Sequence, residues 1–175
     1  SKLKKGISIK KKINNKICKI TLVFTGNKTM TGGRIKKLTK FLDKETFMCT
    51  YGDGLSNINL KKLVKFHNTH RKLATVTAVR PRSRFGKLDI KGNIVKNFKE
   101  KPEMESGWIN GGFFVFNPNF LKLIKNDNTV LEKEPLEKAS KSKNLFAFKH
   151  ESFWHCMDTK RDRDNLAKIL KKNEL

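Results

Sequence analysis

The sequence predicts an α/β fold, a parallel sheet with helices on its faces, from two observations. Short runs rich in β-branched and aromatic residues alternate with runs whose apolar residues recur at helical spacing. The first half of the chain follows the order strand, loop, helix, strand, loop, helix, strand. That order is typical of parallel strands joined by crossover helices.

The elements of the first half are read from these patterns. ICKITLVF and LATVTAV are strand-like, and RIKKLTKFLD and NLKKLVKFHNTH have helical spacing. We expect strands at 17–24, 45–50 and 73–79, and helices at 34–43 and 59–70.

The second half changes in style. Residues 84–102 have the pattern of a hairpin with its turn at Lys91-Gly92-Asn93, and the strand at 108–118 is stopped by Pro118. The remaining expected elements are helices at 120–125, 131–140 and 162–172 and strands at 144–150 and 153–158.

Domain organisation is simple in this interpretation. Residues 1–16 are a basic, weakly patterned lead in which we expect little order, or an edge strand at most. Residues 17–175 contain no repeat and no linker, so we expect one domain there.

The charge of the chain limits its function classes. The 175 residues carry 40 Lys and Arg against 16 Asp and Glu, a net charge of +24, which suggests a nucleic-acid-binding protein. However, the lysines are spread over nearly every segment, and with one Tyr and two Trp the chain lacks interleaved aromatics that stack on bases. We therefore favour a Lys-rich surface, one that attracts anionic ligands such as nucleotides.

Location is indicated by what the sequence lacks. No apolar run is long enough for a membrane span, and no apolar segment of a secretory signal follows the basic start. The three cysteines are far apart, with no CxxC pair, which favours a reducing, cytoplasmic setting without a zinc site.

Two aspartates directly follow apolar strands. Asp53 lies in YGDG after the strand at 45–50, and Asp158 follows FWHCM and precedes a helix start at Thr159. Each has an ordinary explanation, a turn for Asp53 and a helix cap for Asp158. As a pair at one side of a sheet they would suit Mg²⁺, which binds one or two carboxylates plus substrate phosphates.

A glycine- and threonine-rich loop, TMTGGRIKKL, precedes the first helix. Backbone N–H groups at a helix start favour an anion, and the Arg34 guanidinium adds a bidentate phosphate donor. An ordinary loop with a threonine cap is the alternative, since the loop matches neither GxxxxGK[ST] nor GxGxxG.

Two further residues could face a ligand. Lys101, before a proline in FKEKP, has an extended backbone that could direct its ammonium into a cleft. Asn110 in WINGGFF can both donate and accept hydrogen bonds, which suits sugar hydroxyls. A charged strand end and a turn are the ordinary alternatives.

Seven motifs occur in an order that is similar to a known family. From about Ile17 to about Lys172 the chain resembles the glucose-1-phosphate cytidylyltransferases, which are sugar-nucleotide pyrophosphorylases. The motifs are TLVFTGNKTMTGGRIKKL, TYGDG, RFGKLDI, FKEKP, INGGFFVFNP, EKEPLEKAS and FWHCMDTKRD.

The resemblance implies a fold and a reaction. The fold would be the Rossmann-like α/β nucleotidyltransferase fold, a mixed, mostly parallel sheet with helices on both faces. The reaction would join CTP and α-D-glucose 1-phosphate into CDP-glucose and pyrophosphate, in the biosynthesis of surface sugars such as those of O antigen. Such enzymes are cytoplasmic homo-oligomers.

The resemblance also implies roles for residues. Asp53 and Asp158 match the two Mg²⁺-binding aspartates of the family. Thr29, Arg34 and Gly52 match positions that contact the nucleotide or sugar nucleotide, and Lys101 and Asn110 match positions near the sugar phosphate.

Two departures from the family pattern stand out. Phe24 occupies the place of a usual Asp and cannot make its polar contacts. The glycine-rich GGxGTRL loop and the following PKP segment with its lysine have no counterpart, so we expect a fragment without the first strand or strands. We expect this fragment to be inactive alone and to expose the edge of the strand at 45–50. A nucleotidyltransferase for another base or sugar, or a basic nucleic-acid-binding protein, remain the alternatives.

Overall fold

The computed structural model describes residues 7–13, 15–42, 44–81, 86–100 and 107–171. The chain divides into two compact units. The first is built from Ser1–Glu45 and Pro118–Lys143, and the second from Thr46–Asn117 and Asn144–Leu175. Each unit therefore combines segments that are far apart in the sequence.

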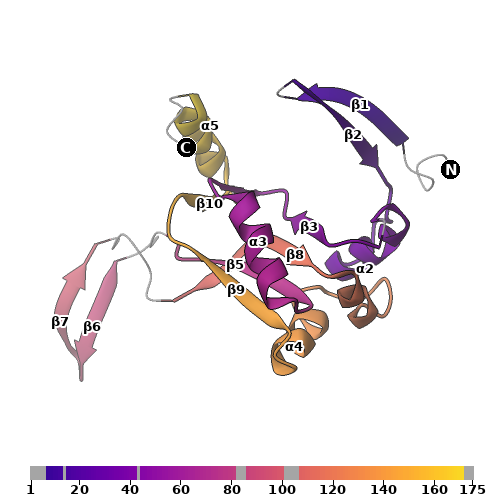
Figure 1. The fold of residues 1–175 in the computed structure, drawn as a ribbon. Coiled ribbons are helices and arrows are strands. Elements are labelled where there is room, and N and C mark those ends of the chain that lie inside the picture. Colours follow the sequence, from indigo (N-terminus) through magenta and orange to yellow (C-terminus); the bar gives the residue numbers. More distant parts are fainter. Residues whose placement is uncertain (1–6, 14, 43, 82–85, 101–106, 172–175) are drawn as a thin grey trace. The chain divides into compact units, whose positions relative to one another are not determined.

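The first unit begins with a β-hairpin of strands β1 (Ile7–Ile13) and β2 (Lys16–Leu22). The strands pair antiparallel from Ile7–Leu22 to Ile13–Lys16 (Figure 1). Asn15 lies at the turn with a φ of 62°, a left-handed conformation that Asn tolerates. Of the two alternatives expected before residue 17, little order or an edge strand, residues 7–13 form the strand. The expected strand at 17–24 is found, but in this hairpin and not in the main sheet.

Helix α2 (Thr31–Lys37) lies against the segment between η2 (Pro118–Leu123) and α4 (Glu134–Lys141). The N–H of Met30 donates to the carbonyl of Asp127 (2.8 Å), and the N–H of Gly33 donates to that of Thr129 (3.2 Å). A Cβ on Gly33 would lie 2.5 Å from the Asp127 carbonyl oxygen, so only glycine permits this approach. Buried apolar residues complete this unit: Phe120, Ile124, Leu131, Leu136 and Ala139.

The helix predicted at 34–43 differs in its bounds. It begins at Thr31, inside the glycine pair, and a 3₁₀ turn, η1 (Thr39–Phe41), follows it. The helical stretch expected at 120–125 is likewise 3₁₀. Short 3₁₀ turns share the apolar spacing of an α-helix over so few residues, so periodicity cannot separate the two.

The second unit contains a four-stranded sheet in the order β3-β8-β5-β9. Its strands are β3 (Phe47–Thr50), β5 (Ala74–Val79), β8 (Ile109–Phe116) and β9 (Leu145–His150). β8 is antiparallel to both β3 and β5, and β9 is parallel to β5. Three of the four strands therefore run in one direction, which confirms the mixed, mostly parallel sheet. Within the described residues β3 is an edge strand, as expected.

Helix α3 (Leu60–His70) covers one face of this sheet and contacts β5, β8 and β9 (Figure 1). The side chain of Asn59 caps its first turn by accepting from the N–H of Lys62 (2.9 Å). Leu63 of the helix packs on Ile58 and Val115 in the core. The other helices that we expected beside the sheet, α2 and α4, belong to the first unit.

Two smaller sheets and a last helix complete the second unit. Strand β4 (Gly54–Ser56) pairs with β10 (Trp154–Cys156), and α5 (Lys160–Lys171) follows β10. Strands β6 (Lys87–Lys91) and β7 (Ile94–Lys99) form the predicted hairpin, with Gly92 at a φ of 59° in the turn. Within the residues described, no helix is both long and apolar enough to span a membrane.

Candidate functional site

The pairing of β4 with β10 brings the two predicted aspartates into one neighbourhood. Cys156 lies opposite Gly54, and the N–H of Met157 donates to the carbonyl of Asp53 (2.8 Å). Asp158 is the next residue after Met157. Asp53 and Asp158 are thus held at the same end of a two-stranded sheet by backbone hydrogen bonds, and both side chains are exposed.

Asp158 is not the residue that caps α5. The hydroxyl of Thr159 accepts from the N–H of Asp162 (3.1 Å), and the Asp162 carboxylate accepts from the N–H (2.9 Å) and hydroxyl (2.8 Å) of Thr159. This reciprocal pair is a capping box. Asp158 Oδ2 accepts instead from Cys156 Sγ (3.1 Å). The helix-cap explanation of Asp158 is therefore wrong.

Asp53 is not used by its own turn either. Within the described part of the chain, no hydrogen bond or ion pair reaches its carboxylate. Gly52, beside it, has no atom within 4 Å of where a Cβ would lie. A ligand could therefore approach the backbone at Gly52 and the carboxylate of Asp53 without displacing a protein group.

Asn110 lies in a small polar arrangement at the start of β8. Its Oδ1 accepts from the N–H of Gly112 (2.9 Å), and its Nδ2 donates to the hydroxyl of Tyr51 (3.2 Å). The Tyr51 N–H in turn donates to the carbonyl of Gly112 (3.1 Å). The amide of Asn110 is thus held in one orientation while its side chain remains exposed.

The glycines of the INGGFF motif are required by this packing. Gly112 has a φ of 76°, and a Cβ there would lie 2.6 Å from Cδ2 of Tyr51. A Cβ on Gly111 would lie 2.8 Å from Cγ1 of Val79. The Trp154 indole also donates to the carbonyl of Gly111 (2.7 Å), which attaches β10 to β8.

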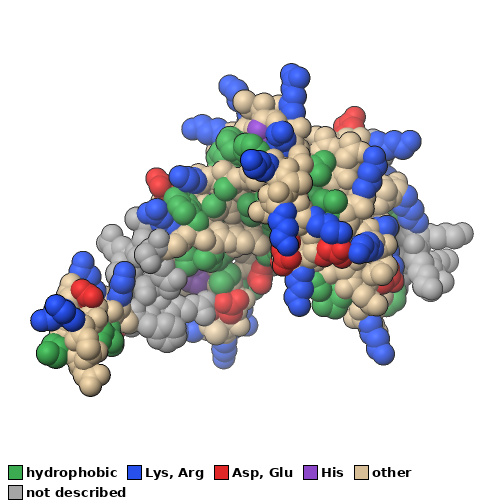
Figure 2. All heavy atoms as spheres, turned by 90° about the horizontal axis from the view of Figure 1, so that it is seen from below, with side chains coloured by type: hydrophobic (Ala, Val, Ile, Leu, Met, Phe, Trp, Pro, Cys, Tyr) green, Lys and Arg blue, Asp and Glu red, His purple; other side chains and the backbone are tan. Residues whose placement is uncertain are grey.

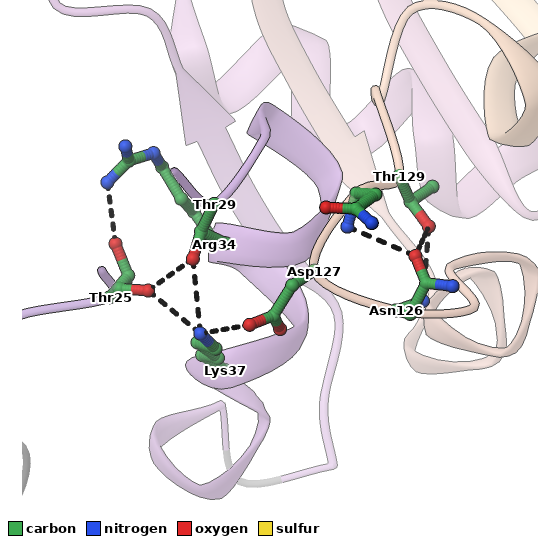
Figure 3. Close-up of polar contacts among 8 residues, drawn as sticks. Thr25, Thr29, Arg34, Lys37, Asn126, Asp127 and Thr129 are labelled. Atoms are coloured by element: carbon green, nitrogen blue, oxygen red, sulfur yellow. Dashed lines mark hydrogen bonds and ion pairs between the residues drawn. The ribbon is translucent and has the colours of Figure 1, made fainter. Parts of the chain in front are cut away.

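The loop predicted to bind phosphate is stabilised by its own side chains (Figure 3). The Thr29 hydroxyl donates to the carbonyl of Thr25 (2.6 Å), and Arg34 Nη1 donates to the Thr25 hydroxyl (2.7 Å). Thr29 is 7% exposed, so its side chain supports the loop, and its contribution to binding would come from the backbone. Arg34 is exposed and uses one of its five N–H donors in this contact.

The predicted site residues lie in two different units. Asp53, Asp158, Gly52 and Asn110 belong to the second unit, and Thr29 and Arg34 belong to the first. Lys101 lies outside the described residues. A groove of about 660 Å³ between α3 and Met48 is lined by none of these residues. Figure 2 shows Lys and Arg side chains scattered over the face in view, with Asp and Glu side chains among them.

Sequence reasoning missed three residues that hold predicted site residues in place. In the second unit Tyr51 orients Asn110. In the first unit Thr25 accepts from Arg34, and Lys37 of α2 donates to Thr25 and Thr29. Tyr51 could have been found, because it is the sole tyrosine of the chain and directly precedes Gly52. Lys37 could not, because nothing in the sequence distinguishes it among 40 basic residues.

Comparison with known proteins places the chain in a family. The sequence profile of the nucleotidyl transferase family matches residues 2–159, so the chain belongs to the nucleotidyl transferase family. It is 46% identical over 156 residues to the glucose-1-phosphate cytidylyltransferase of Salmonella typhimurium, covering 89% of this chain and 61% of that protein. The resemblance seen in the motifs is confirmed.

Two further relatives have related names. A probable glucose-1-phosphate cytidylyltransferase of Bacillus subtilis is 44% identical, over 81% of this chain and 56% of its own length. The mannose-1-phosphate guanylyltransferase catalytic subunit beta of Drosophila pseudoobscura pseudoobscura is 36% identical, over 70% of this chain and 34% of its own length. The chain thus spans less than two thirds of the length of these relatives.

Solved structures agree on the fold. HddC from Yersinia pseudotuberculosis superposes with a TM-score of 0.65 at 20% identity, over 90% of this chain and 68% of that one. An apo UDP-glucose pyrophosphorylase superposes with a TM-score of 0.62 at 15% identity, over 88% of this chain and 64% of that one. The α/β nucleotidyltransferase fold is therefore confirmed.

Proposed function

We propose that this chain acts in the transfer of a cytidylyl group from CTP to α-D-glucose 1-phosphate, giving CDP-glucose and pyrophosphate. The observation that carries this proposal is the β4–β10 pairing. It puts Asp53 beside Met157, the residue before Asp158, and both aspartate side chains are exposed. The identity to cytidylyltransferases supports the choice of nucleotide and sugar.

Asp53 and Asp158 are the residues that would hold Mg²⁺. Carboxylate oxygens are the hard donors this ion prefers, and both aspartates are exposed at the same end of the β4–β10 pair. Mg²⁺, when bound, would offset negative charge on the phosphates.

The other residues would bind and orient the substrates. Arg34 retains N–H donors for a phosphate, and the Gly52 backbone permits close approach. Asn110 would present its amide to a sugar hydroxyl. An oxygen of the sugar phosphate attacks the α-phosphorus of CTP in line, and the bond to the β-phosphate breaks as pyrophosphate leaves.

Three finer features follow from the resemblance and belong to the same proposal. We place the protein in the cytoplasm, as a homo-oligomer, in the synthesis of a sugar nucleotide for surface polysaccharide. Nucleic acid and membrane are not among its proposed partners. Because a guanylyltransferase is also a relative, transfer of another base is the second candidate.

Calorimetric titration with CTP in the presence of Mg²⁺ tests the proposal. Binding is the appropriate measurement because the chain spans 61% of the cytidylyltransferase it matches. We expect binding to the unchanged chain and a loss of at least about tenfold in Asp53→Asn and Asp158→Asn, since each removes a charged metal ligand. Asp164→Asn, which removes an aspartate paired with Arg163 on α5, is the matched control and should bind normally.

The same titration separates the two candidates. Tighter binding of GTP than of CTP would favour the second candidate. Absence of any nucleotide binding, or equal binding by the two aspartate variants, would contradict the proposed site.

A further inference from the structure

Lys37 joins three separate segments of the first unit. Its Nζ donates to the carbonyl of Thr25 (2.9 Å) and to the hydroxyl of Thr29 (3.1 Å), and forms an ion pair with Asp127 Oδ2 (2.5 Å). Figure 3 shows the ammonium at the centre of these contacts. A Lys ammonium has three donors, and Lys37 therefore uses all of them within the protein.

Arg34, one turn earlier on α2, is in the opposite situation. It contacts the same Thr25 through Nη1 only, and its side chain is exposed. Two cations thus enter one loop, but only Arg34 retains donors for an anion. Both cations contact Thr25: Arg34 donates to its hydroxyl, and Lys37 donates to its carbonyl.

The backbone of the loop is close to the Thr29 side chain at Gly26. Gly26 has a φ of 100°, a conformation in which glycine is the most adaptable residue, and a Cβ there would lie 2.8 Å from Thr29 Oγ1. The Thr25 carbonyl accepts from both Thr29 and Lys37. Residues 25–29 are therefore held by polar contacts of Thr29 and Lys37 in addition to the burial of Thr25 and Thr29.

We propose that Lys37 is a positioning residue that fixes the Thr25–Thr29 loop and, through Thr25, sets the orientation of the Arg34 guanidinium for an anionic ligand. The role of Arg34 rests on the proposed function. The fixing of the loop does not, and it can be measured without a ligand. Lys37 and Asp127 are both partly exposed, at 38% and 57%, so the ion pair itself adds little to global stability.

Hydrogen–deuterium exchange of residues 25–30 tests the structural part. In Lys37→Met we expect exchange there to become about tenfold faster with little change in exchange across β8 and β5, because the ammonium contacts are lost locally. Lys37→Arg should restore slow exchange, since a guanidinium can donate to the same acceptors. Lys40→Met, an equal loss of charge outside this network, is the matched control.

Titration with CTP and Mg²⁺ tests the coupling to Arg34. Lys37→Met should weaken binding about tenfold, and Arg34→Met combined with Lys37→Met should bind no more weakly than Arg34→Met alone. An additive double variant would show that Lys37 acts as a separate charge and would overturn the positioning role. If the unchanged chain binds no nucleotide, the proposed function fails, and hydrogen–deuterium exchange alone tests whether Lys37 fixes the loop. Unchanged exchange in Lys37→Met would overturn the inference.

Discussion

The main-chain N–H of Met157 donates to the carbonyl oxygen of Asp53 at 2.8 Å, a contact between distant parts of the sequence that the β4–β10 pair brings together. This contact makes Asp158 a neighbour of Asp53. The capping box formed by Thr159 and Asp162 serves α5, and the side chains of Asp53 and Asp158 are both exposed.

The separation of roles between Asp158 and Asp162 can be tested by parallel substitution. Asp162→Ala should lower the free energy of unfolding by about 1 kcal/mol, because it removes half of the capping box. Asp158→Asn should leave stability nearly unchanged and abolish Mg²⁺-dependent nucleotide binding. Urea denaturation and calorimetric titration measure the two effects, and a destabilised Asp158→Asn with normal binding would reverse the assignment.

The two glycines flanking the site should respond differently to alanine. Gly112→Ala should destabilise the second unit by about 1–3 kcal/mol, because its new Cβ would meet the Tyr51 ring at 2.6 Å and its φ is 76°. Gly52→Ala has open space and should change stability little, yet weaken nucleotide binding if a ligand approaches there. Thermal unfolding with CTP titration distinguishes them; equal stabilities for the two variants would contradict the packing described.

Stability should depend on pH through α3. His67 Nδ1 and His70 Nε2 lie 2.9 Å and 2.7 Å from one hydroxyl, that of Thr75. Burial, followed by the neighbouring His70, lowers the pKa of His67; burial, followed by Lys72, lowers the pKa of His70. The unfolded chain therefore binds protons at higher pH than the folded chain does, and stability present above about 6.5 is lost as pH falls below it.

Urea unfolding at pH 7.5 and pH 5.5 measures this effect. The free energy of unfolding should be smaller at pH 5.5, and His67→Gln should reduce the difference between the two values. A stability that rises on acidification would show that the imidazoles gain protons on folding, contrary to their burial.

Thr29 should be a supporting residue, in contrast to Arg34. Thr29→Val removes a hydroxyl that donates to Thr25 and accepts from Lys37 in a buried position, and should cost about 1–3 kcal/mol of stability. Arg34→Met should cost less stability but more nucleotide affinity. Denaturation and titration of both variants check this; a Thr29→Val protein of unchanged stability would contradict the described network.

Local pattern was sufficient for most elements. The helix expected at 59–70 is found at 60–70 because its apolar spacing and the Asn59 cap agree. The hairpin turn predicted at 91–93 is found, because Gly92 can adopt the positive φ that this turn has. Strand β4 was missed because its three residues are too few for a period to appear.

The pairing of segments that are far apart in the chain could not be predicted from the sequence. The insertion of β8 between β3 and β5 joins strands some 60 and 35 residues apart, and periodicity contains no information on such pairing. The same holds for the joining of α2 to the 124–131 segment, which divides the chain into two units. The aspartate pair was predicted from strand ends, but the β4–β10 pairing that unites it was not.

Crystals grown with CTP and Mn²⁺, which replaces Mg²⁺ and gives an anomalous signal, test the central claim most directly. We predict an anomalous peak contacted by carboxylate oxygens of both Asp53 and Asp158 at about 2.1 Å, with CTP phosphate oxygens completing the shell. A peak elsewhere, or carboxylates more than about 10 Å apart around no shared ion, would contradict the account, because ligands of one metal must converge on it.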